Sequence, residues 1–181
     1  MNIYQISSKE ISIEIIKNIT ENNCKIELSD EAKNRVTKCR QYLDKKMLSQ
    51  KEPIYGITTG FGALYNVSID KEQLSQLQKN LVMSHACGCG DVVPNDIVKL
   101  MLLLKIQSLS YGYSGVQLIT IERLIDFYNN DILPVVYQQG SLGASGDLVP
   151  LAHLCLPLLN LGEVSYQGKI YQATEINKQF G

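Results

Sequence analysis

The chain alternates between stretches in which apolar residues recur every three or four positions and short stretches rich in glycine. The first periodic stretch follows Ser7-Ser8-Lys9-Glu10, which matches a capping box, and it predicts a short amphipathic helix from Ile11 to Ile19. Residues 25–28 alternate like a brief strand. A second helix is expected after Ser29, its candidate N-cap, and before Pro53.

Three further helices are predicted between residues 70 and 130. Asp70 is the candidate cap of a helix whose apolar stripe contains Leu74, Leu77 and Leu81, and His85 falls on the same stripe at the helix end. The next stretch begins at Asn95 or Asp96 and is apolar nearly all round, which indicates burial on more than one side. A conventional stripe then runs from Leu118 to Tyr128.

The last fifty residues predict a mixture of short elements. Residues 132–137 are expected to be extended, and a helix is expected after residue 147, with Pro150 in its first turn. Its buried stripe should contain Leu148, Leu151, Cys155 and Leu158, with Pro157 as a kink and Gly162 as a stop. Residues 163–171 alternate around Gln167-Gly168, which indicates a hairpin. The expected fold is therefore mainly α, with long ordered loops and a small β-hairpin near the C-terminal end.

Composition narrows the class of protein. A chain of 181 residues is long enough for one domain, and 17 basic against 18 acidic residues leave no basic cluster that would predict nucleic acid or a membrane surface as a partner. The chain has no apolar run long enough for a membrane span and no secretory leader. Five cysteines, an odd number, favour reduced thiols in the cytoplasm.

Two glycine-rich segments contain the candidate functional residues. The first, residues 54–67, holds three glycines among apolar residues that argue against disorder, so it reads as a long ordered loop. The second, Gly140 to Pro150, reads Gly-Ser-Leu-Gly-Ala-Ser-Gly-Asp-Leu-Val-Pro. Because glycine lacks the Cβ clash, this backbone can fold back so that one amide nitrogen approaches a carbonyl two residues earlier.

Three blocks carry a family resemblance. Residues 55–62 (Tyr-Gly-Ile-Thr-Thr-Gly-Phe-Gly), residues 80–85 (Asn-Leu-Val-Met-Ser-His) and residues 140–152 resemble, in this order along the chain, the histidine and aromatic amino acid ammonia-lyases. The resemblance implies that residues 1–181 form a single N-terminal lyase domain. It also implies that a C-terminal helical bundle of the family lies beyond this chain, which is then expected to be inactive alone.

The resemblance also implies a chemistry. Ala144, Ser145 and Gly146 would cyclise, with loss of two waters, into the electrophile 4-methylidene-imidazol-5-one (MIO), so no external cofactor and no metal is expected. Tyr55 would remove the substrate's β-proton, and His85 would bind its side chain. Gly62 and Asp147 would support the loops, Asp147 by holding the electrophile's loop at the start of a helix.

The favoured substrate is L-histidine, with trans-urocanate as the product, in a homotetramer of the full-length protein. Family members with Ser-His at positions matching 84–85 tend to act on histidine, although some act on tyrosine. A tyrosine or phenylalanine ammonia-lyase, an aromatic 2,3-aminomutase and a non-catalytic fragment therefore stay open as alternatives.

Other interpretations of the same residues are weaker. A serine-hydrolase elbow fails because Asp147 stands where its last glycine belongs, and His153 is the nearby candidate base. His85, Cys87 and Cys89 offer soft metal ligands, but a closed zinc site needs a fourth. Gly60 and Gly62 are not followed by the Gly-Lys-Ser/Thr of a phosphate loop.

Overall fold

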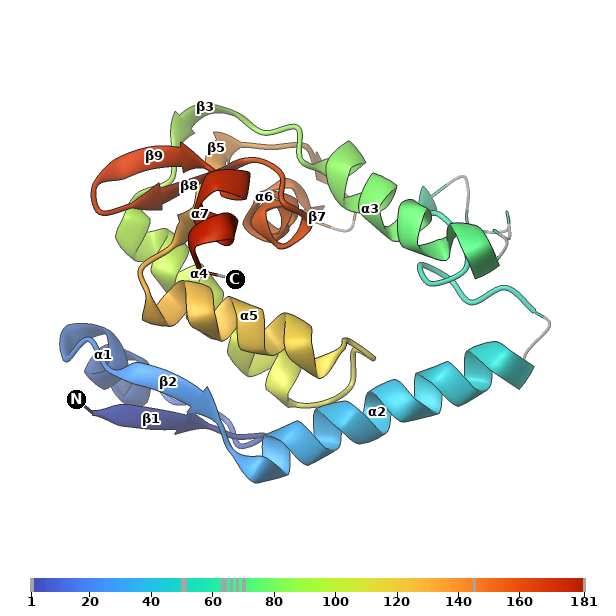
Figure 1. The fold of residues 1–181 in the computed structure, drawn as a ribbon, viewed down its shortest axis with the longest axis horizontal. Coiled ribbons are helices and arrows are strands. Elements are labelled where there is room, and N and C mark those ends of the chain that lie inside the picture. The colour runs from blue at the N-terminus through green and yellow to red at the C-terminus, as the bar shows by residue number, and fades with distance from the viewer. Residues whose placement is uncertain are drawn as a thin grey trace. The chain divides into compact units, whose positions relative to one another are not determined.

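The computed structural model describes residues 2–49, 52–62, 65, 67, 69, 71–144 and 146–180. The described chain is mainly helical, as the hydrophobic pattern predicts (Figure 1). It divides into two compact units, each built from separate stretches of sequence. Unit 1 comprises Met1–Leu48, Pro94–Leu133 and Ser165–Ile170, and unit 2 comprises Ser49–Val93, Pro134–Val164 and Tyr171–Gly181.

Unit 1 contains four helices and a two-stranded parallel sheet among its described residues. Its elements are β1 (Ile3–Ile6), α1 (Ile13–Glu21), β2 (Lys25–Leu28), α2 (Asp30–Ser49), α4 (Asn95–Ser110) and α5 (Leu118–Asn129). In the sheet, Ile3 lies opposite Lys25 and Ile6 lies opposite Leu28. The Ser29 hydroxyl accepts the Ala32 N–H at 3.2 Å, so Ser29 caps α2 as predicted.

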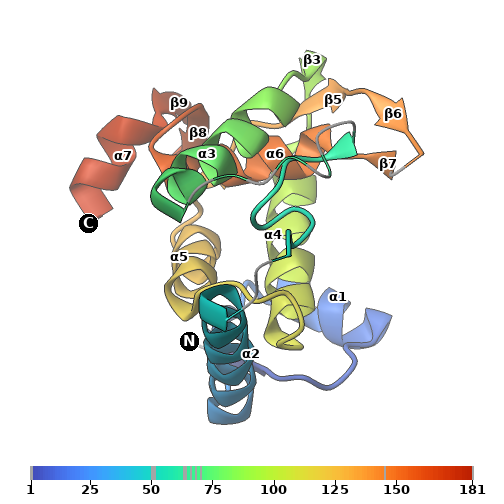
Figure 2. The ribbon, with the colours of Figure 1, turned by 90° about the vertical axis from the view of Figure 1, so that its right-hand side faces the viewer.

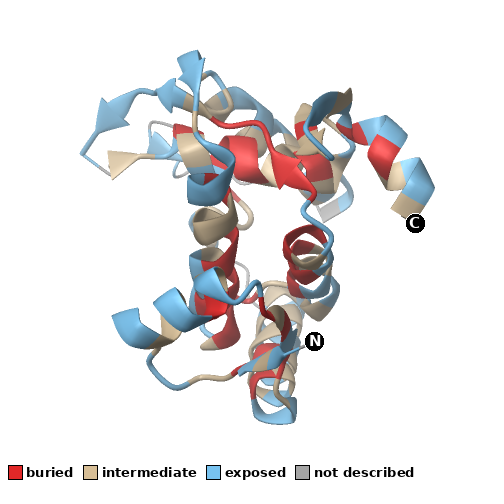
Figure 3. Cartoon of the chain, turned by 90° about the vertical axis from the view of Figure 1, so that its left-hand side faces the viewer, coloured by how far each residue is buried: buried red, intermediate tan, exposed pale blue. Residues whose placement is uncertain are grey.

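The core of unit 1 lies where α4 and α5 pack on each other. The most deeply buried side chains come from these two helices and from the sheet; buried positions are red in Figure 3. They include Ile6, Ile26, Leu102, Leu103, Ile106, Ile121, Leu124, Phe127 and Tyr128. Helix α4 is buried on more than one side, as its composition predicts, although Ile97 and Leu104 stay partly exposed.

An asparagine ties α5 to the sheet. The Asn129 side chain accepts the N–H of Ile26 at 2.9 Å and donates to the carbonyl of the same residue at 2.9 Å. Both backbone groups of a buried strand residue are thereby satisfied by one side chain. Asn129 therefore acts as a substitute for a neighbouring strand.

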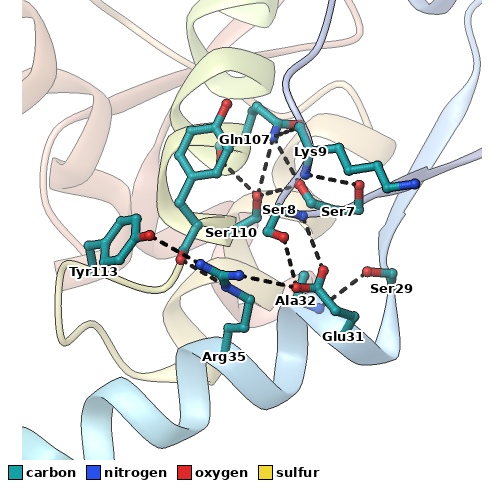
Figure 4. Close-up of polar contacts among 11 residues, drawn as sticks. Ser7, Ser8, Lys9, Ser29, Glu31, Ala32, Arg35, Gln107, Ser110 and Tyr113 are labelled. Carbon is teal, nitrogen blue, oxygen red and sulfur yellow. Dashed lines mark hydrogen bonds and ion pairs between the residues drawn. The ribbon is translucent and has the colours of Figure 1, made fainter.

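The predicted capping box at residues 7–10 is wrong. Gln107 Nε2 donates to the carbonyls of Ser7 and Lys9 at 2.9 and 3.1 Å, and the Ser110 hydroxyl donates to Ser7 at 3.0 Å (Figure 4). These bonds hold the segment in a bent, non-helical conformation. The helix starts later, at Ile13, where the Ser12 hydroxyl accepts the Ile15 N–H at 3.3 Å.

A second polar cluster joins the same segment to α2. Glu31 accepts the Ser8 hydroxyl at 2.7 Å and lies 3.6 Å from Arg35, whose Nε donates to the Tyr111 carbonyl (Figure 4). Arg35 also donates to the Tyr113 hydroxyl at 3.3 Å. The hydroxyl and N–H of Ser8, with Arg35, hold the pKa of Glu31 below its usual range.

Unit 2 is built around the helices α3 and α6, which pack on each other (Figure 2). Strands β3 and β5 pair antiparallel, with Val92 opposite Tyr137. The unit's elements are η2 (Lys71–Gln73), α3 (Leu74–His85), β3 (Cys89–Val92), β5 (Tyr137–Gln139), β6 (Leu142–Gly143), β7 (Gly146–Asp147), α6 (Val149–Cys155), η3 (Leu156–Leu159) and α7 (Ala173–Phe180).

In each of the remaining strands the sequence passes from one unit to the other. They are β4 (Leu133–Pro134), β8 (Glu163–Tyr166) and β9 (Lys169–Gln172). The predicted hairpin is confirmed: Gln167 and Gly168 join β8 to β9 with φ values of +50° and +75°. Two successive positive φ angles are typical of a tight hairpin turn whose twist matches the strands.

The predicted buried face of α6 is wrong. Leu148 and Leu151, expected on the stripe, are 37% and 41% exposed, whereas Ala152, His153 and Leu154 are buried. Helix α3 and strand β5 both pack on this short helix, and the consecutive buried residues 152–154 span about 200° of it, so burial is not confined to one stripe. The expected kink is a change of helix type, since α6 ends at Cys155 and a 3₁₀ turn follows.

Other expectations have mixed outcomes. The candidate cap Asp70 lies outside the described residues. No helix in the described part of the chain is long and apolar enough to span a membrane. Across the described residues, no cluster of three or more metal-ligating side chains is found, and Cys87 and Cys89 are exposed free thiols.

Candidate functional site

The segment that carries Tyr55 is a tight turn held by threonines. The Ile54 carbonyl accepts the N–H groups of Ile57 and Thr58 at 3.0 and 2.9 Å, and the Thr58 hydroxyl accepts the Ile54 N–H at 2.8 Å. Thr59, fully buried, accepts the Gly56 N–H through its hydroxyl at 3.2 Å. The ordered loop expected from the sequence is confirmed for these residues.

Glycine is required at position 56 by its conformation and its surroundings. Gly56 has a φ of +69°, and a Cβ atom there would lie 2.7 Å from Cε1 of Phe61. The close approach lets the Phe61 ring lie beside the turn. Gly62 also has a positive φ, of +57°, but a Cβ there would meet nothing within 4 Å, so its role is conformational.

A side chain of helix α3 forms hydrogen bonds to the backbone of this turn. Gln78 Nε2 donates to the carbonyls of Gly56 and Ile57 at 3.1 and 3.2 Å. Tyr55 is the residue before these two carbonyls, so one side chain of α3 fixes the backbone beside the candidate base. The Tyr55 side chain itself is 62% exposed.

Three aromatic rings form a line of contacts, in which the ring of Phe61 contacts one ring in the turn and one at the end of α3. The Phe61 ring centroid lies 5.8 Å from that of Tyr55 and 5.6 Å from that of His85, in tilted and edge-to-face geometry. Both distances lie in the range of favourable aromatic contacts. Two residues that sequence reasoning selected separately are therefore brought together through Phe61, which that reasoning did not select.

The surroundings of His85 fix its tautomer. His85 Nδ1 lies 2.7 Å from the Leu81 carbonyl and 3.2 Å from the Ser84 hydroxyl, which itself donates to Leu81. A carbonyl only accepts, so Nδ1 carries a proton. In the neutral imidazole Nε2 is then unprotonated and is a hydrogen-bond acceptor.

The second glycine segment is a short hairpin. Strands β6 and β7 pair antiparallel, with Leu142 opposite Asp147 and Gly143 opposite Gly146. Ala144 lies in the turn and is exposed, and Ser145 lies outside the described residues. Gly146 has a φ of +87°, a conformation that L-residues rarely adopt.

Asp147 joins this hairpin to the helix that follows. Its Oδ1 accepts the N–H of Val149, the first residue of α6, at 3.1 Å. A carboxylate at this position satisfies one of the free N–H groups of a helix start and is favoured by the helix dipole. The helix begins at Val149, two residues after Asp147, with Pro150 in its first turn as predicted.

The fold identifies a class of proteins, as a comparison with solved structures shows. Solved structures with closely similar folds are the ergothioneine-degrading enzyme ergothionase of Treponema denticola (TM-score 0.92, 28% identity, 98% of this chain and 35% of that chain) and a phenylalanine aminomutase of Pantoea agglomerans (TM-score 0.89, 32% identity, 99% and 34%). The described residues thus have the ammonia-lyase and aminomutase fold.

The family follows from the sequence. A model described as "Aromatic amino acid lyase" matches residues 11–181, and the chain belongs to this family. A histidine ammonia-lyase of Deinococcus radiodurans is 44% identical over 176 residues, which make up 97% of this chain and 33% of that protein. The chain thus spans about a third of the length of the curated relative it matches.

Proposed function

We propose that this chain supplies the electrophile, the base and the side-chain-binding histidine of a histidine ammonia-lyase, which eliminates ammonia from L-histidine to give trans-urocanate. The observation that carries the proposal is the line of rings from Tyr55 through Phe61 to His85, held by one helix. The 44% identity with the Deinococcus radiodurans enzyme supports the choice of reaction.

Tyr55 is the proposed base. A tyrosine is almost fully protonated near pH 7, so its phenolate must be favoured by donors or positive charge in the assembled site. The turn contributes a fixed position: the threonine bonds and Gln78 hold the backbone on both sides of Tyr55. Fixing the base in this way reduces the entropy that proton abstraction would otherwise cost.

His85 is the proposed contact for the substrate's side chain. Its unprotonated Nε2 needs a donor on the ligand, and the imidazole N–H of histidine or the hydroxyl of tyrosine supplies one. The phenyl ring of phenylalanine does not, and a site built to accept such a bond rejects an analogue without it. The geometry therefore favours L-histidine, or L-tyrosine, over L-phenylalanine.

The β6–β7 hairpin fits the prosthetic group that the family implies. Gly143 and Gly146 lie opposite each other across the hairpin, and the positive φ of Gly146 bends the chain sharply. Ala144, Ser145 and Gly146 would form MIO, which supplies an electrophile for the substrate. Asp147 would hold this loop at the start of α6, and no external cofactor or metal enters the proposal.

The assembly belongs to the same proposal. We propose residues 1–181 as one N-terminal lyase domain of a homotetramer in the cytoplasm, where thiols such as those of the five cysteines, which form no disulfide, stay reduced. Its partner is an amino-acid substrate, with no nucleic acid and no membrane.

Two measurements test the proposal. The intact mass of the denatured chain should be lower than the mass of its sequence by two water molecules, and the deficit should map to a peptide with Ala144 and Gly146. An unmodified mass contradicts ring formation by this chain alone. Incubation of the complete protein, of which this chain would be the N-terminal part, with L-histidine should give urocanate, and turnover of phenylalanine in its place would contradict the role of His85.

A 2,3-aminomutase is the second candidate, because the Pantoea agglomerans phenylalanine aminomutase shares the fold at 32% identity. Product analysis separates the two reactions. Elimination releases ammonia and an unsaturated acid, whereas a mutase returns a β-amino acid and no net ammonia. A protein with neither product and with an unmodified mass would be the non-catalytic alternative.

A further inference from the structure

His153 has an unusual position for a histidine without an assigned role. It lies on α6, four residues after the helix start, and is only 7% exposed. Its Nε2 accepts the backbone N–H of Gly88 at 3.0 Å. Its ring also meets the Tyr137 ring edge-to-face at a centroid distance of 5.3 Å. The bond and the ring contact together hold the imidazole in one orientation.

The contact with Gly88 is so close that only glycine fits. A Cβ atom at position 88 would lie 2.9 Å from Val149 Cγ1, 3.0 Å from His153 Nε2 and 3.1 Å from Tyr137 Cβ. Real Cβ atoms essentially never approach a neighbour as closely as the 2.9 Å to Val149, and the other two distances are tighter than nine in ten real Cβ contacts. The backbone at Gly88 is therefore packed directly against α6 and β5.

The bond joins two segments that the proposed function uses. Gly88 lies three residues after His85, just past the end of α3. His153 and Val149 lie on the helix whose first N–H is held by Asp147, next to Gly146. A displacement of Gly88 from α6 would therefore move the end of α3, and His85 with it, away from the segment that follows the hairpin.

The bond also fixes the chemical state of His153. Because Nε2 accepts a hydrogen from a backbone amide, Nε2 is unprotonated and the proton of the neutral ring is on Nδ1. Burial lowers the pKa of His153, which favours this neutral form. A cationic ring would have no lone pair for the Gly88 N–H.

We propose that His153 is a positioning residue, whose neutral Nε2 holds Gly88 and thereby places His85 relative to the helix that follows the Ala144-Gly146 turn. The inference rests on the proposed function for its catalytic meaning. Its structural content, one acceptor atom and one N–H, can be tested without any turnover.

The first experiment uses ¹⁵N NMR of the histidine side chains in the 181-residue chain with its natural sequence. The imidazole spectrum should show His153 with a protonated Nδ1 and an unprotonated Nε2, and His85, whose Nδ1 donates to Leu81, should show the same tautomer. A His153 ring protonated at Nε2 would overturn the proposal, because that atom could not accept the Gly88 N–H.

Two variants then separate the acceptor from the bulk of the ring. His153→Gln keeps an acceptor at a similar reach, whereas His153→Leu fills the space without one. Hydrogen exchange of the Gly88 N–H should become about tenfold faster in the Leu variant and change less than about threefold in the Gln variant. Equal exchange in the two variants would overturn the proposal, even if both are less stable.

The catalytic consequence is read from kinetics on the protein that turns over histidine. Since His85 is proposed to bind the substrate's side chain, His153→Leu should raise KM by about tenfold with a smaller effect on kcat, and His153→Gln should restore most of the loss. An equal loss in both variants would overturn the positioning role. Absence of turnover in the complete wild-type protein would refute the proposed function, and the tautomer and hydrogen-exchange results would still decide whether His153 holds Gly88.

Discussion

Gly140 offers a sharp test of how the hairpin is attached to α6. A Cβ atom at this position would overlap both carboxylate oxygens of Asp147 and lie 2.7 Å from its Cγ. In Gly140→Ala the carboxylate must therefore turn away and lose its bond to the Val149 N–H, which is 3.1 Å long. Gly143→Ala is the matched control, because a Cβ there would meet nothing within 4 Å.

The magnitude follows from the bond that is lost. A hydrogen bond from a helix N-terminus to a partly exposed carboxylate is worth about 1–2 kcal/mol. Alanine in place of glycine also restricts the unfolded chain, which stabilises the fold by about 0.4–1 kcal/mol. Both variants share this second effect. Gly140→Ala should therefore be less stable than Gly143→Ala by about 1–2 kcal/mol.

Native-state hydrogen exchange measures this difference in stability at the Val149 N–H itself. Exchange of the Val149 N–H should be about 5 to 30 times faster in Gly140→Ala than in Gly143→Ala, and the extent of the two-water mass deficit should fall in the first variant. If the Val149 N–H exchanges equally in both variants, Asp147 does not hold the start of α6, and the reasoning is refuted.

Three further predictions concern other contacts. Asn129→Ala should lower the free energy of unfolding by about 2 kcal/mol, since two buried backbone groups of Ile26 lose their partner; urea titration measures it, with Asn130→Ala as the control. Burial raises the pKa of Tyr128 to about 12, so stability should be full below pH 10, where the unfolded chain starts to ionise, and should fall by about 2 kcal/mol as the pH rises to 12. Urea titrations at pH 9 and 11 check this, and Tyr128→Phe should remove that part of the loss. Gln78→Ala and Gln78→Glu, which both lack the donor, should each speed hydrogen exchange in the Tyr55 turn about fivefold; an unchanged rate in both would exclude a role of Gln78 in holding the turn.

Periodicity predicted most of the helices and one hairpin. Helices α2, α3, α4 and α5 lie where apolar spacing places them, because each is long enough for a stripe to stand out. Short elements were not predicted where contacts with residues far away in the sequence determine the local conformation. Strand β1 pairs with β2 across some twenty residues, and Gln107, about a hundred positions away in the sequence, holds residues 7–9 in a non-helical conformation. A local motif such as residues 7–10 cannot reveal such partners.

The candidate site was predicted less completely than the fold. Tyr55, His85 and the residues of the Ala144-Gly146 turn were selected through resemblance, and their roles stay predictions. Phe61 and Gln78 carried no signal of their own, because a phenylalanine beside glycines and a glutamine on a polar helix face are ordinary. His153 was considered only as a base for another reaction, and its contact with Gly88 spans 65 positions.

The arrangement on α3 has a consequence for changing substrate preference. Gln78 and His85 are seven residues apart, about two helical turns or 10 Å, so they project from nearly the same face. Gln78 donates to two carbonyls of the turn that carries the proposed base, and His85 is the proposed contact for the substrate's side chain. A substitution at position 85 can thus exchange one side-chain contact while the hydrogen bonds of Gln78 two turns earlier are kept. A single-residue insertion between them would rotate one by about 100° and uncouple both.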